Sequence, residues 1–380
     1  MLRALFSTLT VLVLASGSAS AGNPPASAIE SNAALKYWQG FATLPKFTEA
    51  EEVKLRGEAL TMPLDAQARE IVDKAEYSLR MMHRAALLPR CSWGMSYGED
   101  GINALLPHAQ PSRVMTSLAC LRARLRFSEG RKAEAIDDVI DAMTLGRNIS
   151  LDGSLIAVLV GYSIEHRMIE TLAVELPKLD ASTIQGVKKR FDALPPFGTV
   201  AQALITCEKA TLEWFAREVV AIKNEERLNI FLTTMTGSPE KSRTLVLQCG
   251  GNVDGLIKCA DRSRESYVVI AAKMDLPPDQ FEKELEREMR KQLGNPVFDL
   301  LFPAINKVFR AKERSDVYRA LFSAALAVQI EGRDALKTHI DPVGGGAFEQ
   351  VPFDGGYELR SKLKRDDNRP VTLTVGRRKG

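Results

Sequence analysis

Helical periodicity broken at intervals by turn residues is the feature that most constrains the fold of this chain. In residues 136–143 the apolar positions follow the spacing i, i+3, i+4, i+7, which places their side chains on one face of a helix. These positions are Ile136, Val139, Ile140 and Met143, and the aspartates expected on the other side are Asp137, Asp138 and Asp141. Residues 200–222 and 317–328 repeat the pattern, so most of the chain is predicted to be helical.

Turn signals separate the predicted helices. Examples are Pro89, Gly130, Pro195-Pro196, Gly237-Ser238-Pro239 and Gly294-Asn295-Pro296. Short connections between amphipathic helices leave few ways to bury both apolar faces other than antiparallel packing. The predicted fold class is therefore mainly α, an array of antiparallel helical hairpins.

Residues 117–145 resemble a hairpin of the tetratricopeptide type. Ala123, Ala135 and Ala142 stand where that motif places small residues, and Gly130 stands at its turn. A shift of about 34 residues in either direction gives no second copy of the pattern. Two interpretations stay open, a single tetratricopeptide-like hairpin within a helical array and an ordinary helical hairpin with a glycine turn.

A change of pattern after residue 338 predicts a small antiparallel sheet. Residues 348–353 and 357–363 have the alternation of strands, and Asp354-Gly355-Gly356 between them forms a tight turn. Val371, Leu373 and Val375 alternate with threonines as a third strand. Three short strands are marginally stable alone, so we expect the sheet to pack on the helical body through its apolar face.

The first 21 residues indicate export. Arg3 precedes an apolar run over residues 4–15, and Ala19-Ser20-Ala21 supply the small residues of a cleavage site. We expect a signal peptide over residues 1–21, a helical hairpin domain over 22–338 and the small sheet over 339–380. The expected location is the periplasm or the extracellular space, with no membrane span after removal of the signal.

Composition excludes several classes of function. With 45% apolar and 26% charged residues, the chain has the composition of an ordinary globular protein. A formal net charge of +3 gives no general attraction to nucleic acid. No glycine-rich loop has the flanking residues of a phosphate cradle, so no cofactor is predicted.

Five cysteines in an oxidising compartment predict at least one disulfide. Cys249 and Cys259 flank the turn-prone Gly250-Gly251-Asn252 and are the first candidate pair, with Cys91 and Cys120 second. Cys207 is then the remaining thiol. No C-x-x-C pair occurs, which argues against zinc ribbons and thioredoxin-type redox sites.

The connection over residues 89–101 is the strongest candidate for a binding surface. It carries Arg90, Trp93 and Tyr97 between glycines, and His108 follows it closely. Loops on helical scaffolds commonly display binding residues, so these four could hold a peptide or a sugar. The alternative is a cap on the core, with Trp93 buried and Cys91 bridged.

Candidate catalytic and metal sites are sparse, since the chain has four histidines. His166 and Glu170 lie one helical turn apart and could face one ion, but no spacing supplies a third ligand, so no metal is predicted. Gly161 to Glu165 lacks the second glycine of a nucleophile elbow, and Ser163 lies in a helical pattern. No catalytic residues are therefore assigned.

Several short motifs resemble those of a family of exported helical proteins from planctomycete-type bacteria. They are Leu88 to Gly94, Leu105-Leu106-Pro107-His108, the hairpin at Gly130, Asp341-Pro342 and Phe353-Asp354-Gly355-Gly356. The resemblance covers most of the chain after residue 21 and implies an exported helical protein. The family has no assigned reaction, so the resemblance implies no activity.

Two functions follow as hypotheses. The favoured one is an exported, non-catalytic protein that binds a peptide, a protein or an envelope component through its helical array. The alternative is an envelope hydrolase with a site near Glu165, His166 and the 89–101 loop. The hydrolase requires His166 or His108 within hydrogen-bond reach of a carboxylate in a cleft.

Overall fold

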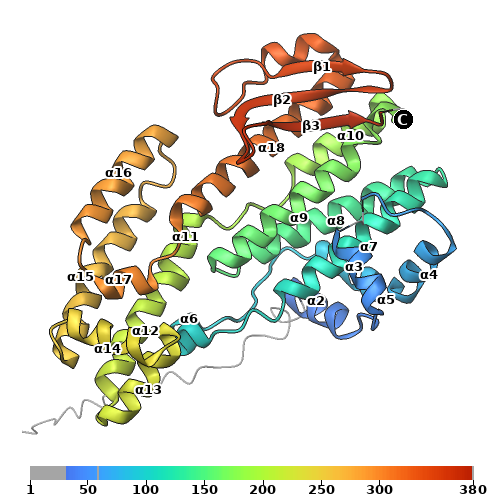
Figure 1. Ribbon diagram of the computed structural model, residues 1–380. Coiled ribbons are helices and arrows are strands. Elements are labelled where there is room, and N and C mark those ends of the chain that lie inside the picture. The colour runs from blue at the N-terminus through green and yellow to red at the C-terminus, as the bar shows by residue number, and fades with distance from the viewer. Residues whose placement is uncertain (1–30, 58–59, 379–380) are drawn as a thin grey trace, which may run out of the picture.

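A computed structural model describes residues 31–57 and 60–378, and the predicted signal peptide lies outside these ranges. The described chain is mainly helical and ends in a three-stranded antiparallel sheet, as the sequence predicts (Figure 1). No helix in the described ranges is both long enough and apolar enough to cross a bilayer.

The helices and strands follow in chain order. The N-terminal half contains α2 (Ala33–Ala42), α3 (Glu49–Gly57), α4 (Ala66–Lys74), α5 (Glu76–Ala86), α6 (Tyr97–Asp100), α7 (Ala109–Ser128), α8 (Lys132–Ser150), α9 (Leu155–Ala173) and α10 (Ala181–Asp192). The C-terminal half contains α11 (Val200–Ala203), α12 (Lys209–Ala221), α13 (Glu225–Thr236), α14 (Pro239–Gln248), α15 (Val253–Ala271), α16 (Pro278–Lys291), α17 (Pro296–Leu301), α18 (Ile305–Glu331), β1 (Glu349–Phe353), β2 (Gly356–Lys364) and β3 (Pro370–Gly376).

Side-chain caps fix where many of these helices begin. Asn32 Oδ1 accepts a hydrogen bond from the Ala34 amide at 3.2 Å, and Ser154 Oγ accepts one from Ala157 at 3.1 Å. Further caps are Asp65, Asp180, Thr199, Asn224, Ser238, Asn252 and Asn295. Because a cap satisfies an amide that the helix leaves unbonded, the polar residues of the turns also start the next helix.

The antiparallel hairpin predicted near Gly130 is formed by α7 and α8. Gly130 has φ of +78°, in the left-handed region that favours glycine, and the Arg131 amide donates to the Arg126 carbonyl at 2.8 Å. The apolar face of α8 is buried as expected. The opposite side is covered as well, because α5 and α7 pack against it, and Asp138 and Asp141 are buried there.

Two hydrophobic cores share two helices. The first core lies among α2 to α5, α7 to α10, the C-terminal half of α18 and the sheet, and the second lies among α11 to α17 and the start of α18. Helix α9 contributes Ile164 to the first core and Val158 to the second. Helix α18 contributes Leu321 to the first core and Phe309 to the second. Figure 1 shows both helices where the two halves of the molecule meet.

The helix predicted over residues 200–222 contains one wide turn. A π-helical segment, Leu204–Glu208, joins α11 to α12. Leu212, Phe215 and Val219 are buried in the second core, as their spacing predicts. The segment carries Cys207 and Glu208, both half-buried.

The sheet has the order β1-β2-β3, with Val351 opposite Glu358 and Leu359 opposite Leu373. Leu359 and Leu373 on its inner face are buried in the first core, and the Tyr357 hydroxyl donates to the Ala325 carbonyl of α18 at 3.4 Å. The sheet therefore packs on the helical body through its apolar face, as predicted.

No disulfide joins the five cysteines, all of which lie in the described ranges. The predicted pairs are therefore absent. Cys249 and Cys259 are close enough to interact as thiols, because Cys249 ends α14 and Cys259 lies on α15 across the turn. Cys91 and Cys120 have different partners, since the Cys120 sulfur lies 3.2 Å from Thr171 Oγ1 of α9 while the Cys91 thiol lies near the Ala34 backbone.

Candidate functional site

The four residues predicted as a binding surface occupy two environments. Arg90 is exposed, and its carbonyl accepts a hydrogen bond from the Ala33 amide at 2.7 Å. Trp93, Tyr97 and His108 are buried, with exposed fractions of 8%, 4% and 0%. Their side chains are therefore inside the protein and are not presented to a ligand at the surface.

Trp93 and His108 stack within an aromatic cluster. The two ring centroids are 4.6 Å apart and the planes differ by 15°, while Tyr37 stacks on the Trp93 ring at 5.7 Å. Trp93 Nε1 donates to the Asn148 carbonyl of α8 at 2.7 Å. Because the buried indole has both ring contacts and a hydrogen-bond acceptor, this cluster fixes the 89–108 segment on the first core.

His108 is also paired with a carboxylate that the sequence analysis did not select. Its Nε2 lies 2.6 Å from Asp152 Oδ2, and both side chains are fully buried. The Tyr97 hydroxyl donates to Asp152 Oδ1, and burial raises the pKa of Tyr97, so this phenol stays protonated. The pair satisfies the distance required for a hydrolase, but it contacts no solvent and therefore has no access to a substrate in this structure.

Glu165 and His166 are neighbours in sequence but have different surroundings. The Glu165 carboxylate is buried and accepts a hydrogen bond from Arg147 Nε at 3.0 Å. Burial raises the pKa of Glu165, and the charges of Arg147 and Arg319 partly oppose this. The guanidinium groups of both arginines also lie over the Phe197 ring, at 4.3 and 4.8 Å from its centroid. Glu165 is thus part of a packed interior cluster.

His166 instead borders a groove between α9 and α18. Its side chain is 34% exposed, its Nε2 lies 3.3 Å from Glu170 Oε1, and its ring centroid lies 3.5 Å from that of Tyr318. The groove has a volume of about 740 Å³. It is lined by Leu159, Tyr162, Ser163, His166 and Glu170 of α9, by Ala304, Lys307, Val308, Ala311, Arg314, Ser315 and Tyr318 from α18 and its start, and by Arg365 after β2.

Three cations line this groove together with one carboxylate, Glu170. Lys307, Arg314 and Arg365 are exposed, and their side chains form no ion pair with any residue between 31 and 378 that the structure describes. Other cations of α18 are paired. Arg310 lies 3.9 Å from Glu282, and Lys312 lies 3.2 Å from Asp316. The positive charge at the groove is therefore available to an anionic ligand.

Two phenols complete the chemistry of the groove. Burial raises the pKa of both Tyr162 and Tyr318 to about 12, so their hydroxyl groups remain neutral donors at ordinary pH. Together with Leu159 and Val308 their rings make an apolar floor beneath the cationic rim. Such a combination of apolar area and a few polar groups is typical of binding sites.

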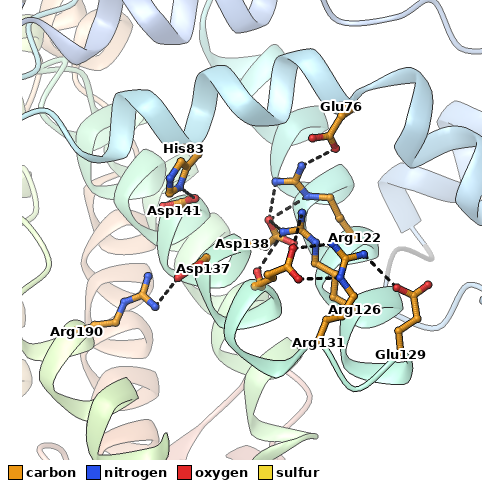
Figure 2. A network of polar contacts seen from close by, with 11 residues as sticks. Glu76, His83, Arg122, Arg126, Glu129, Arg131, Asp137, Asp138, Asp141 and Arg190 are labelled. Carbon is orange, nitrogen blue, oxygen red and sulfur yellow. Dashed lines mark hydrogen bonds and ion pairs between the residues drawn. The ribbon is translucent and has the colours of Figure 1, made fainter.

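A second polar cluster, which sequence analysis missed, links α5, α7 and α8 (Figure 2). Arg122 Nε donates to Asp138 Oδ1 at 3.0 Å, and Arg122 Nη1 donates to Glu76 at 2.9 Å. Arg126 approaches the same Asp138 oxygen at 2.8 Å. Burial raises the pKa of Asp138, and the two arginines partly oppose this, so the cluster is a buried ion network holding three helices together.

His83 and Asp141 form a further pair in Figure 2, with Nδ1 and Oδ2 2.8 Å apart. Burial raises the pKa of Asp141 to about 6, and His83 partly opposes the shift. No group of three or more His, Cys, Asp or Glu side chains in the described ranges is arranged to hold a metal ion.

Comparison with protein-family models, with curated protein sequences and with solved structures found no match to this chain.

Proposed function

We propose that this chain is an exported, non-catalytic binding protein, and that its groove between α9 and α18 holds an acidic peptide segment. The observation that carries the proposal is the set of three unpaired cations, Lys307, Arg314 and Arg365, around one concave surface of about 740 Å³. The part of the proposal that concerns export is supported by the N-terminal sequence pattern alone.

A peptide suits the groove because the lining is mixed. Carboxylates of the ligand would meet the three cations, and its backbone and side chains would contact Tyr162, Tyr318 and the apolar floor. A nucleic acid would need a wider basic surface, whereas Glu170 lies in this lining and the whole chain has a net charge of only +3. A non-catalytic role is favoured because the His108–Asp152 pair and the Glu165 cluster lie away from solvent. His166 Nε2 lies 3.3 Å from Glu170 Oε1 in the groove but forms no hydrogen bond with it among the described residues.

The test is a binding measurement with a fluorescein-labelled peptide of Glu, Asp, Gly and Ser. Wild-type protein is compared with a triple variant, Lys307→Gln, Arg314→Gln and Arg365→Gln. Loss of three favourable charge contacts is expected to weaken binding at least about tenfold. The difference in affinity between the wild type and the variant should be smaller at high salt, because salt screens the charges. Fluorescence anisotropy at two salt concentrations measures both effects.

The matched control removes the same charge elsewhere. Lys241→Gln, Arg243→Gln and Lys258→Gln change exposed cations of α14 and α15 that are absent from the groove lining. We expect this control to bind like the wild type. Equal weakening by both triple variants would show that net charge, and not the groove, determines binding, and would overturn the proposal.

A further inference from the structure

A second concave surface lies on the other side of α9. This cleft has a volume of about 410 Å³ and lies between the segment after α2, α3, α7 and α9. Its walls are mainly apolar and include Leu44, Phe47, Leu55, Val114 and Ile164. Its size and lining are those of a pocket for one or two bulky apolar side chains.

The cleft and the groove meet at one residue. Ser163 is exposed and lines both of them. Along α9, Ile164 and Arg167 belong to the cleft, whereas His166 and Glu170 belong to the groove. A ligand that lies in the groove can therefore continue over Ser163 into the cleft without leaving the surface of the protein.

The positive character of the groove also continues to the cleft. Arg113 and Arg167 line it, and Glu52 is the one acidic residue recorded in its lining within the described ranges. Arg167 is half-buried, and its Nη1 donates to Ser117 Oγ at 2.6 Å, which holds the guanidinium at the cleft wall. An anionic ligand crossing from the groove thus meets cations on both sides of α9, and the cleft adds the apolar side chains of Leu44, Phe47 and Leu55.

We infer that the partner is an acidic segment that carries a bulky apolar anchor, and that this anchor enters the cleft. The inference rests on the proposed function, because it assigns the acidic part to the groove. The acidic part would supply attraction and orientation, and the anchor would supply buried apolar area, as central anchors do in many interfaces.

The experiment compares three peptides on the same protein. The first is the acidic peptide described above, the second adds a Leu-Phe pair at its N-terminal end, and the third adds the pair at its C-terminal end. We expect one of the anchored peptides to bind the wild type at least about tenfold more tightly than the plain peptide, because burial of the pair removes apolar surface from water.

Two variants locate the anchor. Val114→Trp fills the cleft from α7, and Phe47→Ser removes an apolar wall from the segment after α2. Circular dichroism shows which variants are folded, and either one suffices for the test. In a folded variant we expect the anchored and plain peptides to bind equally, with the affinity of the plain peptide unchanged.

The outcomes separate the two proposals. If the plain peptide binds the wild type but no anchored peptide binds more tightly, the anchor inference is overturned and the proposed function stands. If an anchored peptide still binds a folded cleft variant more tightly than the plain peptide does, the inference is also overturned, because the anchor then binds elsewhere. Failure of all the peptides to bind overturns both.

Discussion

The imidazole of His108 lies between the indole of Trp93, 4.6 Å away, and the carboxylate of Asp152, whose Oδ2 is 2.6 Å from His108 Nε2. Through this contact the segment before α7 is tied to the turn between α8 and α9. The Tyr97 hydroxyl donates a hydrogen bond to the other oxygen of the same carboxylate. Asp152 therefore contacts two buried side chains of the 89–108 segment.

Replacement of Asp152 should be strongly destabilising. Asp152→Ala leaves the Tyr97 hydroxyl buried without its acceptor and removes the carboxylate beside the buried His108 imidazole. We expect a loss of about 3 kcal/mol in the free energy of unfolding. Urea denaturation followed by circular dichroism measures it. Asp100→Ala is the control, because Asp100 is exposed on the same segment, and its effect should stay within about 0.5 kcal/mol. Similar losses in the two variants would contradict the role assigned to Asp152.

Replacement of a buried arginine in the ion network of Figure 2 should destabilise the protein more than replacement of an exposed one. The Arg122 side chain is 7% exposed and pairs with Asp138, which is 1% exposed, whereas Arg131 is 48% exposed and pairs with Glu134. Arg122→Ala leaves Asp138 with one fewer partner in the interior, and we expect it to cost about 3 kcal/mol or more. Arg131→Ala should cost less than about 1 kcal/mol, since exposed pairs contribute little. Thermal and urea unfolding of both variants provide the comparison, and equal costs would contradict it.

Glu208 should make stability depend on pH. Burial raises the pKa of this carboxyl from its ordinary value of 4.5 to about 7, with the Cys207 hydrogen bond partly opposing. Between these two pH values the folded chain holds a proton that the unfolded chain has lost, so stability falls as pH rises from 4.5 to 7. The decline should amount to no more than about 3 kcal/mol.

The substitution that tests this effect is Glu208→Gln. It should reduce that decline by the share that belongs to Glu208, because Asp141, whose pKa burial also raises, keeps its own share. The variant should be more stable than the wild type at pH 8, with no such advantage at pH 4. Urea titrations across this range measure it, and Glu213→Gln on α12, which follows directly after Glu208, is the control for the chemical change. A wild-type stability that does not fall between pH 4.5 and 7 would refute the assignment.

Two glycines with similar positive φ angles should respond differently to alanine. Gly101 and Gly94 have φ of +56° and +71°, so alanine is strained at both positions. A Cβ on Gly101 would also clash with the Trp214 indole of the second core, while a Cβ on Gly94 would meet no atom within 4 Å. We expect Gly94→Ala to cost about 1 kcal/mol and Gly101→Ala at least about 2 kcal/mol more. Urea unfolding measures both, and equal costs would argue against close packing of Gly101 on α12.

Local patterns were sufficient to predict the mainly helical class, the Gly130 hairpin and the three strands, but not α6, which lies within the predicted loop. Residues 136–143 and 357–363 carry their periodicity within a few residues, and this periodicity is what determines which face is buried. The burial of Asp138 was not predictable in this way. Its partner Arg122 lies on the preceding helix, and only the packing of α7 against α8 brings them together.

The candidate site depends still more on distant contacts. The groove joins His166 on α9 to Tyr318 on α18, and no spacing in the sequence relates the two. Trp93, Tyr97 and His108 were correctly grouped as neighbours, but their burial is set by Tyr37 and Asp152 from other segments. Whether Lys307 and Arg314 have an ion-pair partner among the described residues also depends on carboxylates of other segments, whose positions the sequence does not give.

The sharing of α18 by both cores has a consequence for biosynthesis. Residues 317–328 of this helix, together with the strands after it, close the core that α2 begins near the other end of the chain. A nascent polypeptide emerging from the ribosome therefore cannot complete this first core until its last segments have been made, whereas the second core needs only the start of α18. Until that moment the N-terminal helices lack the partners that close this core, so we expect their apolar faces to stay exposed while the rest of the chain is synthesised.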